Sequence, residues 1–281
     1  MHLLTPTLMP KSTRATDPRQ QRIARHLASV VSATPLERAP FDHLVLSDVF
    51  PQDLYAQILN LLPERSYYRG LKHSEALLPD GSSARLQFPL VEGNIARLPE
   101  GVRQFWSMVA AAVKSREVES AYKQKFRETL ERVSGKPLAS IRLRPYAILF
   151  RDVGGYKISV HPDSPRKAIT TQFYLPADDS QLHLGTVFHE PLPGGGYRQV
   201  RAMRFAPNTG YAFAVSPTSF HSVNPMRADD LPRNSLMIII NYDRGPLIEG
   251  FKAARSQVRG WYDRLRGKRA GREAGEGAYE N

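Results

Sequence analysis

Three residues of types that commonly bind metal ions lie at or near the ends of predicted strands. His161 and Asp163 form a His-x-Asp pair directly after the segment YKISVH, and His221 follows just beyond the segment GYAFAVS. Two imidazoles and one carboxylate on one side of a metal ion fill three positions of an octahedron and leave three open. The set therefore predicts a site for iron(II) that still binds further ligands.

An arginine suited to bind a carboxylate comes after the second histidine. Arg233 enters the predicted strand RNSLMIIINY, twelve residues beyond His221. A guanidinium gives a carboxylate a two-pronged, charge-assisted contact. We therefore expect Arg233 to bind a carboxylate of an organic acid that is held at the metal.

Other histidines and arginines compete for these roles. His183 and His189 flank Gly185, and a third imidazole at the metal would indicate a cupin-like site. His183 lies on the predicted strand 181–188 and His189 directly follows that strand, and we expect both to face solvent or the mouth of the site. Arg227 follows His221 too closely to act as the carboxylate ligand, and we expect it on the surface.

The elements that must position these residues change in kind along the chain. Apolar residues at helical spacing predict helices over 18–33, 51–62, 101–134 (as two helices, with Gly135 as a C-cap) and 251–266. Residues 65–100 are expected to be rich in loops. Strands are predicted over 41–50, 141–150, 156–161, 168–175, 181–188, 197–206, 210–216 and 235–242. Successive short strands without helices between them favour an antiparallel sandwich or barrel.

Composition limits the class of protein. The chain has 281 residues, 41% of them hydrophobic, which suits an ordinary globular protein. It has no cysteine, so thiolate metal sites, disulfides and a cysteine nucleophile are excluded. No apolar run reaches the roughly 20 residues needed to cross a bilayer, and the N-terminus does not read as a signal peptide. We therefore expect a cytoplasmic protein without a membrane partner.

The net charge of +12 raises the question of a nucleic-acid partner. Residues 1–26 hold five Lys and Arg against one acidic residue, and residues 251–281 hold eight against four. Two thirds of the excess charge therefore lies at the ends of the chain, which is typical of solvated termini. We expect no nucleic-acid partner.

On these residues, the sequence resembles the Fe(II)- and 2-oxoglutarate-dependent oxygenases, especially their prolyl-hydroxylase-like branch. The matching segments, in order, are HPD, TTQFYLPADD, LGTVF, FAPNTGYAFAV, His221 and Arg233. They span roughly 141–242, with weaker similarity in the strand and helix over 41–62. The resemblance implies a mainly β fold with flanking helices, the double-stranded β-helix, which is a jelly-roll or cupin-like barrel.

The resemblance also implies a division of the chain and roles for single residues. Residues 1–35 form a basic N-terminal segment with a helix, 36–250 the oxygenase domain with its barrel over 141–242, and 251–281 a C-terminal helix and polar tail. His161, Asp163 and His221 match the iron ligands, and Arg233 with Ser235 matches the residues that bind 2-oxoglutarate. Three polar strand residues are candidate substrate contacts: Arg144, Tyr146 and Gln172.

Two departures from the family pattern put substrate contacts in doubt. Leu184 replaces the first residue of the usual Gly-Gly pair before the middle strand, and a long insert, residues 189–202, follows Phe188. Contacts near that insert therefore cannot be carried over from the family.

The implied reaction is hydroxylation of an unactivated C–H bond, with O2 and 2-oxoglutarate consumed and succinate and CO2 released. The related halogenases have Gly or Ala where this chain has Asp163, so hydroxylation is expected, with desaturation and ring closure as the alternative outcomes. The chain has no evident module that reads peptides or nucleic acids, which favours a small molecule, an amino acid or a biosynthetic intermediate. The alternatives are a protein side-chain hydroxylase and a non-catalytic jelly-roll protein that binds or senses metal. The sequence does not specify the oligomeric state.

Overall fold

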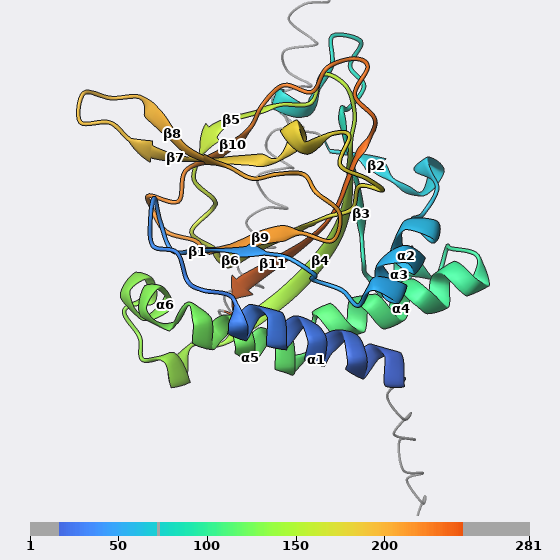
Figure 1. Cartoon of the computed structure of the whole chain (residues 1–281), viewed down its shortest axis with the longest axis horizontal. Coiled ribbons are helices and arrows are strands. Elements are labelled where there is room, and N and C mark those ends of the chain that lie inside the picture. The colour runs from blue at the N-terminus through green and yellow to red at the C-terminus, as the bar shows by residue number, and fades with distance from the viewer. Residues whose placement is uncertain (1–16, 72–73, 244–281) are drawn as a thin grey trace, which may run out of the picture. The chain divides into compact units, whose positions relative to one another are not determined.

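Two antiparallel sheets form the centre of the fold in the computed structural model, which describes residues 17–71 and 74–243 (Figure 1). The seven-stranded sheet has the order β1-β9-β6-β11-β4-β3-β2, and the four-stranded sheet has the order β5-β10-β7-β8. The strands are β1 (His43–Leu46), β2 (Arg69–Gly70), β3 (Arg85–Pro89), β4 (Leu143–Asp152), β5 (Ile158–His161), β6 (Lys167–Tyr174), β7 (Thr186–Pro191), β8 (Tyr197–Ala202), β9 (Gly210–Ala214), β10 (His221–Val223) and β11 (Arg233–Tyr242).

The last eight strands pass back and forth between the two sheets. β4, β6, β9 and β11 lie in the larger sheet, and β5, β7, β8 and β10 lie in the smaller one. This crossing pattern is that of a jelly roll, or double-stranded β-helix. The predicted mainly β fold with flanking helices is confirmed.

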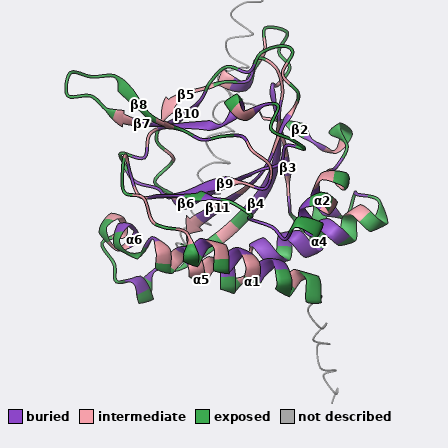
Figure 2. Cartoon of the chain, in the orientation of Figure 1, coloured by how far each residue is buried: buried purple, intermediate pink, exposed green. Residues whose placement is uncertain are grey.

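Helices cover the outer face of the larger sheet (Figure 1). They are α1 (Pro18–Ala33), α2 (Gln52–Asn60), α3 (Glu92–Ile95), α4 (Glu100–Val113), α5 (Arg116–Lys125) and α6 (Arg127–Ser134). In α1 the predicted apolar stripe is buried, Ile23, Leu27 and Val31 being 0% exposed, and α1 packs against α4 and α5. The buried faces of these helices point inward (Figure 2). Among residues 17–71 and 74–243, no helix combines the length and apolar character that a membrane span requires.

The structure differs from the sequence prediction in several elements. The segment 101–134 forms three helices instead of two. The Ser115 side chain accepts a hydrogen bond from the Val118 amide and starts α5, and a second break at Phe126 separates α5 from α6. Gly135 ends the third with a φ of 66°, as predicted. The predicted loop region contains β2, β3 and α3. The segment 189–202, which the sequence analysis singled out as an insert, forms the end of β7, a turn and β8. The predicted helix 251–266 lies outside the described residues, and the domain division stays a prediction.

Gly185 lies where the chain entering β7 passes the backbone of Met203. A Cβ atom on Gly185 would lie 1.6 Å from the Met203 carbonyl oxygen. Backbone atoms cannot yield by that much without moving the strand, so Gly185→Ala is expected to lower the free energy of unfolding by about 1–3 kcal/mol. Denaturant unfolding measures this, with Gly194→Ala as the control, since a Cβ there meets nothing within 4 Å. Equal unfolding midpoints for the two variants would contradict the prediction.

Candidate metal centre

The two histidines of the predicted metal site are direct neighbours on adjacent strands. His161 ends β5 and His221 begins β10, and the two are paired across the antiparallel ladder. Their ring centroids are 4.4 Å apart. Asp163 lies in the turn after β5, and one ligand atom from each of the three residues lies within 4.8 Å of the others. The structure thus brings together the three residues that the sequence singled out.

Hydrogen bonds fix both imidazoles with the same nitrogen free. His161 Nδ1 lies 2.8 Å from the carbonyl of Ser159, and His221 Nδ1 lies 3.1 Å from the carbonyl of Ser219. A carbonyl oxygen can only accept, so Nδ1 carries the proton in each bond and Nε2 is the nitrogen left to bind a metal. Metal-binding histidines typically have this outer hydrogen bond.

The carboxylate of Asp163 is ionised and held in place. Thr170 Oγ1 donates to its Oδ2 at 2.6 Å, and Lys167 Nζ lies 2.5 Å from its Oδ1. Burial alone would raise the pKa of Asp163, but the positive charge of Lys167 and the hydrogen bonds hold it below its usual value. The carboxylate is therefore available as an anionic ligand.

Burial also keeps His221 neutral. It lowers the pKa of His221 to about 4, although the charge of Asp163 works in the opposite direction. An imidazole must be deprotonated to bind a metal, and His221 meets that condition at neutral pH. Two imidazoles fixed through Nδ1 and one carboxylate fit a divalent transition metal such as iron(II).

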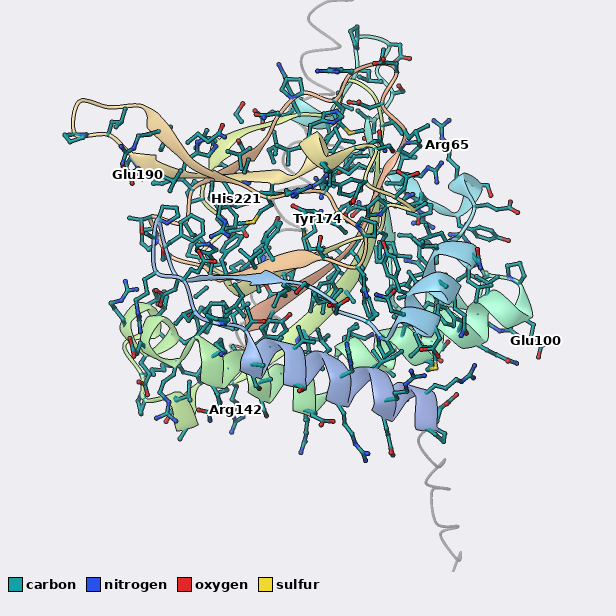
Figure 3. All side chains as sticks on the ribbon, in the orientation of Figure 1. Arg65, Glu100, Arg142, Tyr174, Glu190 and His221 are labelled. Carbon is teal, nitrogen blue, oxygen red and sulfur yellow. The ribbon has the colours of Figure 1, made fainter. Side chains whose placement is uncertain are left out.

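The cluster forms part of the wall of a cavity of about 190 Å³. The cavity lies among strands of both sheets, and His221, labelled in Figure 3, is part of its wall. Its polar lining, apart from the cluster, includes Arg85, Tyr156, Gln172, Thr186 and Tyr211. A ligand in this cavity would reach the metal site and a guanidinium together.

Arg233 is fully buried and fixed by three hydrogen bonds. Its Nε donates to the Leu184 carbonyl at 2.6 Å, its Nη1 to Asp152 Oδ2 at 2.7 Å, and its Nη2 to Thr186 Oγ1 at 3.3 Å. It is 0% exposed and is not among the residues that line the cavity. Thr186, which does line it, links Arg233 to the cavity.

A chain of polar side chains continues from Thr186. The Thr186 hydroxyl donates to the Tyr211 hydroxyl at 3.2 Å, and Tyr211 donates to Gln172 Oε1 at 2.8 Å. The Gln172 amide nitrogen in turn donates to Ser235 Oγ at 2.8 Å. Four buried polar groups are thus satisfied by one another, which holds the hydroxyls of the lining in fixed positions.

The remaining residues singled out by sequence lie in different places. Gln172 lines the cavity, while Arg144 and Tyr146 are exposed on β4 and do not. His183 is exposed and lies 2.9 Å from Asp230, and neither it nor His189 joins the metal cluster. His189 is 8% exposed and its Nε2 lies 2.8 Å from Ser222 Oγ, so the expectation that it faces solvent or the site's mouth is wrong.

Sequence reasoning missed Arg85, Asp152 and Tyr156. Together with Arg233 they form what we call the cationic end of the cavity. Arg85 lies on β3, in a region that the sequence predicted as loop, and Asp152 extends β4 two residues beyond the predicted strand. The signal that was available is the segment RLQFP, which alternates polar and apolar residues as a half-buried strand does.

No protein-family model and no curated protein sequence matches the chain. Among solved structures, the chain is similar to a prolyl-4-hydroxylase from Pseudomonas putida, with a TM-score of 0.49 and 12% identity over 79% of this chain and 99% of that one. A prolyl hydroxylase from Trichoplax adhaerens, in complex with a hypoxia-inducible-factor peptide, gives 0.47 and 12% over 79% and 90%. A 2OG-Fe(II) oxygenase family protein from Burkholderia pseudomallei gives 0.43 and 13% over 83% and 94%.

Proposed function

We propose that this chain is an Fe(II)- and 2-oxoglutarate-dependent oxygenase that hydroxylates an unactivated C–H bond of a small molecule. The observation that carries the proposal is the cluster of two histidines and one aspartate in the wall of a cavity that also contains an arginine. The overall reaction converts R–H, O2 and 2-oxoglutarate into R–OH, succinate and CO2.

His161, Asp163 and His221 would hold the iron. When bound, iron(II) supplies the activation of dioxygen that side chains alone cannot provide. Three ligands on one side leave three octahedral positions for the co-substrate and dioxygen. The bonds from the imidazole Nδ1 atoms and from Thr170 hold the ligands in one arrangement before the metal binds.

The cationic end of the cavity would take the distal carboxylate of 2-oxoglutarate. Three of the five N–H donors of Arg233 bind protein acceptors, and we propose the other two for the carboxylate. Ser235 lies on the same strand and would position Gln172 in the lining through their hydrogen bond.

The rest of the lining suits a compact substrate. The cavity wall also has an apolar component, formed by Leu71, Ala76, Ile158, Met237 and Ile239. Side chains alternate along a strand, so Tyr146 and Arg144 lie on the same face of β4 as the lining residue Phe150. Neither lines the cavity, so we propose Gln172 as the substrate contact within it, and Tyr146 and Arg144 as contacts only for a biosynthetic intermediate that extends out of it along β4.

Succinate formation tests the proposed activity. The protein, loaded with iron(II) under nitrogen and then given 2-oxoglutarate and air, is expected to release succinate and to consume O2. Zinc(II) in place of iron should give none, since zinc binds such ligands without redox chemistry. Absence of succinate from the iron-loaded protein, with and without a panel of amino acids, would leave a metal-binding or sensing protein.

The same assay separates small-molecule from protein substrates. A hydroxylated amino acid, seen as a mass increase of one oxygen in the small-molecule fraction, is the expected result. Increased succinate release only with peptides, with the oxygen on a peptide side chain, would overturn the small-molecule assignment and retain the oxygenase.

A further inference from the structure

Two arginines share one carboxylate at the cationic end of the cavity. Asp152 is fully buried: its Oδ2 accepts from Arg233 Nη1, and its Oδ1 lies 3.6 Å from Arg85 Nε. Burial would lower the pKa of both arginines, but the charge of Asp152 outweighs it and raises them, so both stay charged. The trio therefore carries a net positive charge.

That charge lacks a full counter-ion within the trio. Buried charges are costly unless they are paired and hydrogen-bonded. Asp152 Oδ1 has no hydrogen-bond partner within the part of the chain that the structure describes. The contact between Arg85 and this carboxylate is therefore an ion pair without a hydrogen bond. An anion entering from the cavity would complete the pairing.

Arg85 is the member of the trio that faces the cavity. It is one of the lining residues and Arg233 is not. Its guanidinium carbon lies 3.9 Å from the centroid of the Phe150 ring, which also lines the cavity, and its Nη1 donates to the Tyr156 hydroxyl. A guanidinium stacked on a ring keeps its N–H donors in its own plane, where a carboxylate can meet them.

We propose that Arg85 binds the distal carboxylate of the co-substrate directly and makes the site selective for keto acids with a second carboxylate. Arg233, whose two remaining N–H donors are proposed above for the same carboxylate, also holds Asp152 and Thr186 in place. This inference rests on the proposed function. It assigns a binding role to β3, a strand outside the eight of the jelly roll.

Binding to the metal-loaded protein tests this role without turnover. The probes are 2-oxoglutarate and 2-oxobutyrate, which share the keto-acid end and differ in the distal carboxylate. Calorimetry on the manganese(II)-loaded protein should show tighter binding of 2-oxoglutarate. Arg85→Met should weaken 2-oxoglutarate about 10- to 100-fold, the loss typical of one charge-assisted contact. Binding of 2-oxobutyrate and of manganese should not change.

Two further variants serve as a control for the lost charge and as a substitute for Arg85→Met. Arg69→Met removes the same charge from an exposed position on neighbouring β2 and should bind both acids like the wild type. Arg85→Gln keeps a hydrogen-bond donor for Tyr156. It is used in place of Arg85→Met if that variant unfolds at a lower temperature than the wild type. A folded Arg85 variant that binds 2-oxoglutarate like the wild type would overturn this inference alone. A wild-type protein that binds neither acid would overturn the proposed function and this inference with it.

Discussion

Replacing His221 with alanine is expected to abolish iron-dependent succinate formation. His221 supplies one of three ligand atoms, and water competes with the two that remain. Loss of an outer hydrogen-bond partner already costs about 10- to 100-fold in metal affinity, so loss of a ligand should cost at least that much. Titration with manganese(II) or cobalt(II), followed spectroscopically, measures affinity, and the succinate assay measures turnover. His161→Ala and Asp163→Ala should behave in the same way.

A histidine outside the cluster provides the control. His183 is exposed and lies 2.9 Å from Asp230, away from the cluster residues. His183→Ala should keep metal affinity and turnover. A protein that loses turnover through His183→Ala, while His161→Ala retains it, would have different metal ligands from those proposed.

The chemistry of the site could be predicted because only a few residue types bind metal ions. Few residues bind iron, and His161 and Asp163 stand two apart at the end of a strand whose residues are apparent from their pattern. The pairing of His161 with His221 could not be predicted. His221 starts a strand of three residues, too short for a periodic pattern, and its partner is set by the jelly-roll crossing.

The cationic end was predicted less completely, because buried ion pairs leave no local pattern. Arg233 was found by its distance from His221, yet its partner Asp152 is 81 residues away in sequence. Arg85 joins the same trio from β3, through the register that sets it opposite Asp152. Contacts of this kind depend on strand order, which spacing along the chain does not encode.

Replacing Arg233 with alanine is expected to lower the free energy of unfolding by about 3–5 kcal/mol. Both members of the Arg233–Asp152 pair have side chains that are 0% exposed, and they lie 2.7 Å apart. Removing one partner of a buried pair leaves the other charge without its main compensation, and that range is typical of the cost. Arg85, 3.6 Å from Asp152, compensates only in part. Denaturant unfolding measures the loss, and Arg142→Ala, at an exposed position labelled in Figure 3, is the control.

The size of that loss decides how the carboxylate contact must be tested. An alanine at 233 that unfolds also loses activity, whatever Arg233 binds. Arg233→Lys keeps the charge beside Asp152 and should cost less stability, so its 2-oxoglutarate affinity can be read on folded protein. A loss of about tenfold or more would assign carboxylate contact to Arg233 as well as Arg85. Unchanged affinity, together with a loss in Arg85→Met, would place the contact on Arg85 and leave Arg233 to hold Asp152. An Arg233→Ala variant as stable as Arg142→Ala would mean that the buried pair contributes nothing to the fold.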